Sequence, residues 1–307
     1  MRELITKPLP DKHERHKLFG SVAPGEKTKP TEKDKMSDLQ NTKKDFLFAI
    51  DQVGISNVKH PIQVVSSIEP TNQTTIGNFT LTSSIQKDHK GTNMSRFTEL
   101  MQAYSNGRPF DISIANLKRF TKEMAERLEQ NDNQLTVAFP WFFERKGPAS
   151  DMAGLNHADA ELTILYDKTA GYHITVSLEG KITTLCPCSK EISEYSAHNQ
   201  RGNVKMEVTL APDYDEEEVD WKYALLEAAE SNASARIHPV LKRPDEKMVT
   251  EQAYENPRFV EDIVRLVASD LYEMSFVEKF TVQCRNEESI HLHDAIASIS
   301  YDKALHY

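Results

Sequence analysis

The residues most able to do chemistry are a cysteine pair, a nearby histidine and a later stretch rich in acids and histidines. The pair lies in Cys186-Pro187-Cys188-Ser189-Lys190, His198 follows it, and the later stretch covers residues 287–294. A thiolate, an imidazole and a carboxylate from separate segments can hold a divalent ion and leave one coordination position open. An open position is typical of catalytic metal sites, so the sequence predicts a metal-dependent enzyme.

Cys186 follows a strand-like segment and directly precedes Pro187. A residue before proline favours extended backbone, so we expect its thiol at a strand end, held in a direction that suits a ligand or a nucleophile. Cys188 lies two residues further on and is expected to be structural, with metal binding as the weaker alternative. Cys284 is expected in the core.

Glu288 and His291 are three residues apart, a spacing that turns both side chains toward one ion in a loop or a short helical turn. Glu287, His293 and Asp294 lie close enough to compete for the same roles. A mixed set of thiolate, imidazole and carboxylate accommodates manganese, zinc or iron, and its carboxylates favour the harder ions.

The composition suits one large soluble domain or two halves with a shared core. The chain has 307 residues, of which 38% are hydrophobic and 27% charged, with a formal net charge of -10. This charge argues against a general nucleic-acid-binding protein but permits a local basic pocket for a phosphorylated small molecule.

We find no apolar run long enough to cross a membrane, and the odd count of three cysteines indicates reduced thiols, so a cytoplasmic location is expected.

The chain divides into a polar beginning and a folded remainder. Residues 1–40 are rich in Lys and Pro and lack apolar periodicity, so we expect a disordered tail, with an arm that docks on a neighbouring subunit as the alternative. Residues 41–307 are expected to form one catalytic domain of two halves, about 41–131 and 132–307.

Hydrophobic periodicity predicts the elements that must position these residues. Strands are expected at 46–50, 60–65, 74–81, 135–139, 161–166, 172–178, 204–210 and 280–284. Helices are expected at 94–104, 114–128, 216–230 and 257–271. Strands followed by paired helices, twice over, predict an α+β fold of two similar halves, each an antiparallel sheet with helices on one side. Sheets with exposed edges complete themselves by association into a closed barrel, so we expect a homo-oligomer.

Six segments together resemble the GTP cyclohydrolase type IB family, bimodular members of the tunnelling fold, and they cover nearly the whole folded region. They are Gly91-Thr92-Asn93-Met94-Ser95-Arg96, Leu185-Cys186-Pro187-Cys188-Ser189-Lys190, Ala197-His198-Asn199-Gln200-Arg201, Leu241-Lys242-Arg243-Pro244-Asp245-Glu246, Asn256-Pro257-Arg258-Phe259-Val260-Glu261-Asp262 and Glu288-Ser289-Ile290-His291-Leu292-His293-Asp294-Ala295. Each segment alone is modest, but six in order are specific.

The resemblance implies a hydrolase that converts GTP and water to 7,8-dihydroneopterin triphosphate and formate, the entry step of folate and pterin biosynthesis. It also implies a divalent metal and a homotetramer with active sites at subunit interfaces. An archaeal-type enzyme of the same family, which gives a cyclic phosphate product, and a non-catalytic metal- or pterin-binding protein of the same fold are the alternatives. A nitrile reductase of this fold fits less well, because its Glu-Ser-Lys run is missing.

By resemblance, the metal ligands are Cys186, His198, Glu246, Glu288 and His291, and the catalytic residues are Cys186, His198 and His291. In isolation, His198 reads as a surface histidine and Glu246 as one charge in a solvated loop. The resemblance also implies that Glu261 grips the edge of the guanine base, where a carboxylate accepts hydrogen bonds from the ring N1-H and the exocyclic amine. Its alternative role is to complement the dipole of the helix that begins near Pro257.

The triphosphate needs several fixed cations, and Lys242, Arg243, Arg96 and Arg201 are the expected ones, with His89 a weaker choice. The expected mechanism is attack at C8 of the guanine ring by water that the metal activates, while His198 or His291 protonates the imidazole nitrogen. Hydrolysis of the resulting formamide then releases formate.

Overall fold

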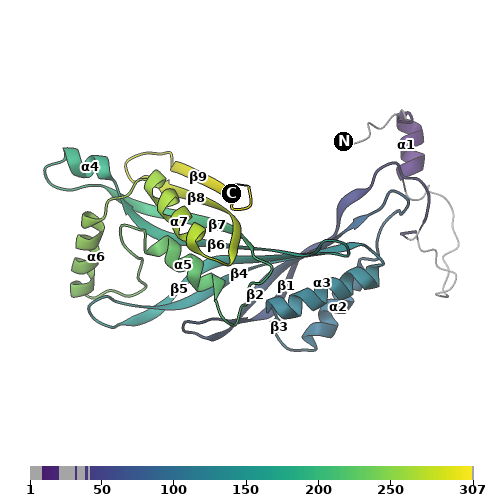
Figure 1. The fold of residues 1–307 in the computed structure, drawn as a ribbon, viewed down its shortest axis with the longest axis horizontal. Helices are drawn as coiled ribbons and strands as arrows, with labels where there is room; N and C mark the ends of the chain where they lie inside the picture. The colour runs from purple at the N-terminus through teal and green to yellow at the C-terminus, as the bar shows by residue number, and fades with distance from the viewer. Residues whose placement is uncertain (1–8, 21–31, 33–38, 41, 306–307) are drawn as a thin grey trace.

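The computed structural model describes residues 9–20, 32, 39–40 and 42–305, and its centre is one large β-sheet (Figure 1). The strand order is β3-β1-β2-β4-β5-β6-β7-β8-β9, and all neighbours pair antiparallel except β1 and β3. The strands are β1 (Ile50–Val65), β2 (Asn72–Ile85), β3 (Phe110–Asp111), β4 (Asp132–Lys146), β5 (Ala153–Asp167), β6 (Gly171–Leu185), β7 (Asn199–Leu210), β8 (Val277–Glu287) and β9 (Ala295–Asp302).

The helices pack on the sheet in two groups. α2 and α3 contact strands β3, β4 and β5, whereas α5 and α7 contact β6, β8 and β9. The helices are α1 (Lys12–Phe19), α2 (Ser95–Ser105), α3 (Ile114–Leu128), α4 (Pro187–Ile192), α5 (Trp221–Glu230), α6 (Arg243–Glu255) and α7 (Val260–Glu273). Two long strands, a helical region and two further strands therefore occur in this order twice, with α2 and α3 in the helical region between β2 and β4, and α5, α6 and α7 in the one between β7 and β8.

The predicted α+β class, with antiparallel strands and paired helices, is confirmed. In the single chain the sheet does not close: β9 forms one edge and β3, beside β1, forms the other. This is the open arrangement that the sequence predicts for one subunit of a tunnelling fold. The boundary between the halves near residue 131 stays a prediction.

One hydrophobic core runs through both groups of elements. Alternate residues of β4 are buried, from Leu135 through Val137 to Trp141, because successive side chains of a strand point to opposite faces. The predicted apolar stripe of α3 is buried in full, at residues 114, 117, 120, 124 and 128. The sheet and its helices therefore form one packed unit, which supports the residues at the strand ends.

One predicted helix begins later than its pattern indicated. Residues 216–220 are not helical, and α5 starts at Trp221. Asp220 caps α5 by accepting a hydrogen bond from the Lys222 backbone N–H at 3.1 Å. The Glu216 carboxylate instead accepts from the backbone N–H of Ile114, at the start of α3, at 3.0 Å. The acidic run 216–218 thus belongs to the loop and not to the helix.

Five of the observed elements were not predicted, namely α1, β3, α4, α6 and β9. α6 buries only Asp245 and Ala253, so it has no apolar stripe for a periodicity argument to find. β9 carries no fully buried residue and pairs only with β8.

Of the predicted tail, the structure describes residues 9–20, 32 and 39–40, and the remainder lies outside the described residues. Lys12–Phe19 forms α1, which buries none of its side chains. Asp11 caps this helix through a hydrogen bond from the Glu14 N–H at 2.9 Å. In the part of the chain that is described, none of the helices has the length and apolar character needed to span a membrane.

Phe110 offers a test of the core under α2 and α3. Its side chain is 0% exposed and meets the rings of Phe79 and Phe120 edge-on, at centroid distances of 5.4 and 5.5 Å. We expect Phe110→Ala to lower the free energy of unfolding by about 3–5 kcal/mol, measured by chemical denaturation followed by circular dichroism. Phe48→Ala is the matched control, because Phe48 is 47% exposed and its loss leaves no internal cavity. Equal effects of the two substitutions would contradict this account of the core.

Candidate active site

Cys186 lies at the end of β6, as predicted. It is the N-cap residue of α4, and Pro187 occupies the first position of that helix. The Cys186 sulfur accepts a hydrogen bond from the Ser189 backbone N–H at 3.5 Å. The strand on one side and the capped turn on the other fix the direction of the thiol. Cys284 is buried, as expected for a core cysteine, and burial raises its pKa to about 12. Cys188 is exposed, and its expected structural role stays a prediction.

After α4 the chain folds back, so that the backbone of His198 lies beside that of Cys186. The Cys186 backbone N–H donates to the His198 carbonyl at 3.0 Å, and the His198 N–H donates to the Ser189 hydroxyl at 3.2 Å. The His198 ring is fixed by Gln200, whose Oε1 lies 2.9 Å from Nδ1. Because an amide oxygen only accepts, Nδ1 carries the proton, and Nε2 keeps its lone pair for another ligand.

Glu288 approaches the same histidine from β8. Its Oε2 lies 3.8 Å from His198 Nδ1, and both side chains are mostly buried, at 13% and 15% exposed. The register of β7 and β8 pairs Arg201 with Glu287, the last residue of β8, which places the following residue, Glu288, beside the start of β7. The structure thus brings Cys186, His198 and Glu288 to one end of three adjacent strands.

His291 lies in the loop after Glu288, and its backbone N–H donates to the Glu288 carbonyl at 3.4 Å. Its exposed ring stacks on that of His293, with centroids 4.8 Å apart and planes 14° apart. The Asp294 carboxylate accepts a hydrogen bond from the Arg285 side chain at 2.6 Å.

The donor types at this strand end fit a divalent ion. His198 has the protonated Nδ1 and available Nε2 that a metal-ligating imidazole needs, and it has a carboxylate beside it. Among the described residues, however, no three His, Cys, Asp or Glu side chains come together in a way that could hold a metal. The single chain therefore supplies matching donors without a complete set.

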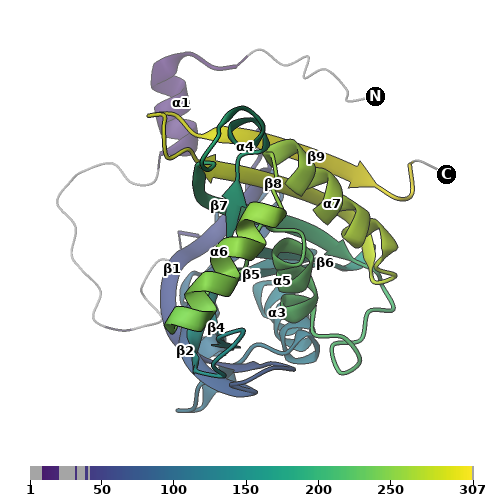
Figure 2. The same cartoon turned by 90° about the vertical axis from the view of Figure 1, so that its left-hand side faces the viewer.

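Glu246 belongs to a different element from these donors, the first turn of α6. α4 and α6 lie at the same end of the molecule, and Figure 2 views that end directly. Lys190 joins the two helices, since its Nζ donates to the Tyr254 carbonyl and lies 4.4 Å from the Tyr254 ring centroid. Tyr254 is eight residues after Glu246, so Glu246 lies about 12 Å along the helix from this contact.

Asp245 explains why α6 begins where it does. The buried Asp245 carboxylate accepts from the backbone N–H groups of Lys242, Ala149 and Ser150 at 2.8, 2.7 and 2.8 Å, and from the Ser150 hydroxyl. These hydrogen bonds, above all the one from the Ser150 side chain, hold the pKa of Asp245 well below its ordinary value. The start of α6, with Glu246, is thereby tied to the β4–β5 connection.

Glu261 is exposed in the first turn of α7. The neighbouring Asp262 makes the capping contact instead, because its Oδ2 accepts from the Phe259 N–H at 2.9 Å. The α7 segment is anchored beside the cysteine, since the Arg258 N–H donates to the Leu185 carbonyl at 2.9 Å. The Glu261 carboxylate forms no hydrogen bond or ion pair with another described residue, so it is available to a ligand.

The predicted cations fall into two groups. Arg201, Lys242 and Arg243 lie near the cysteine end of the sheet, and their side chains make no ion pair with any described residue. Arg96 lies in α2, at the opposite end of the fold from α4, and donates to the Arg127 carbonyl at the end of α3 (Figure 1). His89 contacts Asp88 at 2.8 Å.

A cavity of about 370 Å³ adjoins the cysteine end of the sheet, and Gln200, Arg201, Arg236 and His238 lie in its wall. The Nδ1 of His238 lies 2.9 Å from the Lys146 carbonyl and therefore donates to it. Burial lowers the pKa of His238, which favours the neutral ring.

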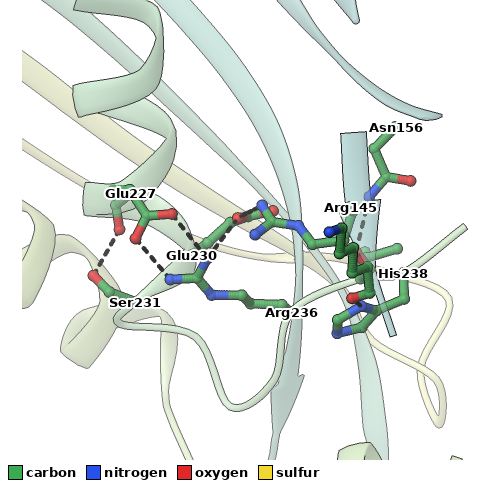
Figure 3. Close-up of polar contacts among 9 residues, drawn as sticks. Arg145, Asn156, Glu227, Glu230, Ser231, Arg236 and His238 are labelled. Atoms are coloured by element: carbon green, nitrogen blue, oxygen red, sulfur yellow. Dashed lines mark hydrogen bonds and ion pairs between the residues drawn. The ribbon is translucent and has the colours of Figure 1, made fainter. Parts of the chain in front are cut away.

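Sequence reasoning missed the buried ion cluster beside this cavity (Figure 3). Glu230, at the end of α5, contacts Arg145 of β4 and lies 3.6 Å from Arg236. Burial raises the pKa of Glu230 to about 7, although both guanidinium groups act to lower it. Arg145 lies 85 positions before Glu230 in the sequence, and Arg236 lies 6 positions after it. No motif or regular spacing links these three charged residues, so the sequence carried no signal for this cluster.

Comparison with known proteins identifies several relatives. The model of a family described as type I GTP cyclohydrolase folE2 matches residues 36–297. A protein of Oceanobacillus iheyensis named GTP cyclohydrolase FolE2 is 69% identical over 298 residues, which are 97% of this chain and 98% of that protein. A protein of Bacillus subtilis with the same name is 54% identical over 296 residues, covering 96% of each chain.

Among solved structures, the chain is similar to uricase from Arthrobacter globiformis. The TM-score is 0.46 at 10% sequence identity, and the match covers 82% of this chain and 93% of the uricase.

The raised pKa of Glu230 leads to a pH-dependent contribution to stability. Its folded pKa of about 7 lies above the ordinary 4.5, so this contribution is full below pH 4.5 and is lost as the pH rises through about 7. We expect the melting temperature of the wild type, relative to that of Glu230→Gln, to fall between about pH 5 and pH 8, because His238 and the other titrating groups are common to both proteins. Thermal unfolding across a pH series measures both. Parallel curves for the two proteins would contradict the assignment.

Proposed function

The chain belongs to the type I GTP cyclohydrolase family described as folE2, and from this premise we propose that its strand-end site opens the guanine ring of GTP at C8. The reaction consumes water, releases formate and yields 7,8-dihydroneopterin triphosphate, the first step of folate and pterin biosynthesis. The observation that carries the proposal is the placement of Cys186, His198 and Glu288 at the same end of three adjacent strands, with the anchored start of α7 and its Glu261 beside the cysteine.

The ion is proposed to be held by Cys186, His198, Glu288 and His291, with Glu246 as a further ligand. When bound, a divalent ion lowers the pKa of a water molecule toward neutrality and so supplies the attacking hydroxide. Manganese and zinc are the proposed metals, with iron as a third option, because the donor set mixes a thiolate with carboxylates.

Glu261 is the proposed guanine-binding residue. A carboxylate offers two acceptors to the ring N1-H and the exocyclic amine, which an amide cannot match with both of its atoms. This role is supported by the free state of the Glu261 carboxylate and by the capping contact that Asp262 makes in its place.

His198 and His291 are proposed to have different roles in the reaction. His198 faces the ion through Nε2, because its Nδ1 proton is held by Gln200. His291, in the exposed loop next to Glu288, is then the group that delivers a proton to the imidazole nitrogen of the guanine. Protonation at that nitrogen makes C8 more electrophilic, and hydrolysis of the formamide that results releases formate.

The triphosphate is proposed to bind Arg201, Lys242 and Arg243, whose charges are not neutralised by other described residues. Arg96 belongs to α2, and Figure 1 shows α2 on the opposite side of the molecule from α6, the helix that begins at Arg243. We therefore propose that Arg96 acts in the site of a neighbouring subunit. This places the active sites at subunit interfaces of a homo-oligomer, with a homotetramer as the proposed state.

The open sheet supports this assembly, because its edge strands leave backbone donors and acceptors for pairing with another copy. The three cysteines are free, in keeping with action in a reducing compartment, and we propose a cytoplasmic location.

Anaerobic incubation of the manganese-reconstituted protein with GTP tests the function directly. Formate together with a fluorescent neopterin product after oxidation is the expected result. A cyclic phosphate product would indicate the archaeal-type reaction. Tight metal binding without formate, under manganese, zinc or iron, would refute the cyclohydrolase assignment and indicate a binding protein.

Cys186 provides the sharpest residue test. We expect Cys186→Ala to abolish formate release, because it removes the thiolate from the strand end, while the oligomer stays folded. Cys188→Ala is the matched control, since Cys188 is exposed and is expected to be dispensable. Formate release by Cys186→Ala at the wild-type rate would exclude the thiol from the reaction.

Glu261→Gln tests guanine recognition. Loss of one charge-assisted hydrogen bond is expected to lower kcat/KM for GTP by about 10- to 100-fold. We also expect the variant to discriminate less between GTP and inosine triphosphate, which lacks the exocyclic amine. Glu273→Gln, at the exposed far end of the same helix, is the control. Unchanged discrimination between the two nucleotides would argue for a helix-dipole role instead.

A further inference from the structure

The sheet opens between β5 and β6 close to the cysteine. These strands pair from Asp159 with Glu179 to Asp167 with Gly171, and beyond Glu179 their ends separate. Residues 231–242, here called the gap segment, bind both separated ends. Ala235 forms a β-bridge with Thr183 of β6, and the Ile237 carbonyl accepts from the Asn156 side chain of β5 at 2.8 Å.

The gap segment is fixed by buried charge. Glu230 directly precedes it, and this carboxylate is 2% exposed between Arg145 of β4 and Arg236 of the gap segment itself (Figure 3). Arg236 is also held by Glu227, whose two oxygens accept from its two terminal nitrogens at 2.8 and 2.7 Å. A buried carboxylate needs such partners, so its charge sets where both arginines lie.

The gap segment reaches the active site at each of its ends. The Ser234 hydroxyl accepts a hydrogen bond at 3.0 Å from the backbone N–H of Leu185, the residue directly before Cys186. At its other end the segment leads into Lys242 and the start of α6. Between these ends, Arg236 and His238 line the cavity that Gln200 and Arg201 share.

From this geometry we propose that Glu230 is a positioning residue for the reaction, acting through Arg236 and the gap segment on the cysteine end of β6 and on the start of α6. Glu230 itself touches neither metal nor nucleotide. Its charge holds the gap segment in register, and the gap segment sets the spacing between Cys186 and the cations of Lys242 and Arg243. The proposal deepens the function proposed above and rests on it.

The matched substitution is Glu230→Gln, which keeps the size of the side chain and removes the charge. A positioning role predicts that Mn²⁺ binding, measured by electron paramagnetic resonance of the free ion, weakens by about 10- to 100-fold. It also predicts that kcat falls by about tenfold or more while KM for GTP changes by less than about threefold. Glu251→Gln is the control, because Glu251 pairs with Lys247 on the exposed face of α6 and should leave all three quantities at the wild-type level.

A merely structural role makes a different prediction. The melting temperature of Glu230→Gln would then differ from that of the wild type, but its folded form would bind Mn²⁺ and turn over GTP like the wild type when assayed well below that temperature. That outcome would overturn the proposal. If Glu230→Gln does not fold, Arg236→Lys replaces it in the same measurements of Mn²⁺ binding, kcat and KM, and the same changes are expected. This substitution keeps the positive charge but loses the paired contact with Glu227.

The two proposals fail in distinguishable ways. A wild-type protein that releases no formate refutes the cyclohydrolase function, whereas the Mn²⁺ titration still compares Glu230→Gln with Glu251→Gln. A wild-type protein that is active, with both variants equal to it in Mn²⁺ affinity and kcat, refutes the positioning role alone.

Discussion

The backbone register of β6, β7 and β8 is the constraint on which the rest of the site depends. Leu185 pairs with Asn199 at the end of β6, so the next residue outward on each strand, Cys186 and His198, must be neighbours. Their backbones are joined by a hydrogen bond of 3.0 Å. The register of β7 with β8 then sets Glu288 beside the same histidine. A slip of one residue in either ladder would turn these side chains to the opposite face, so the hydrophobic core that fixes the register also fixes the donors.

This dependence explains which parts of the molecule the sequence could predict. The stripe of α3 and the alternation of β4 follow from burial on a regular period, and both were found. The strand-end position of Cys186 follows from local rules for a residue before proline, and it was also found. α6 was missed because it is held by polar contacts at its ends: Asp245 ties its start to the β4–β5 connection, and Lys190 holds its last turn. Such contacts join residues far apart in the sequence and leave no periodic signal.

The same reasoning separates the candidate ligands. Cys186, His198 and Glu288 are placed by adjacent strands and therefore lie at the same end of the sheet within one chain. Glu246 lies on a helix that buries only two residues, so its distance from the cysteine depends on the few polar contacts at the helix ends. The sequence identified these residues through family resemblance, but no property of the sequence states how far one lies from another. Only the packed arrangement distinguishes a donor fixed by the sheet from one fixed by a loosely packed helix.

The arginines at the cysteine end of the sheet are of two kinds, those paired with glutamates and those without such a partner among the described residues. The chain carries a formal net charge of -10, yet cations gather at the cysteine end of the sheet. Arg145 and Arg236 are neutralised by glutamates and largely withdrawn from water, which gives them fixed positions and little remaining attraction for an anion. Arg201 and Arg243 make no ion pair with another described residue, so their full charge is available to phosphate. The paired Arg236 thus lies in the wall of the cavity, and the unpaired Arg201 beside it keeps the charge that the proposed triphosphate binding needs in an acidic protein.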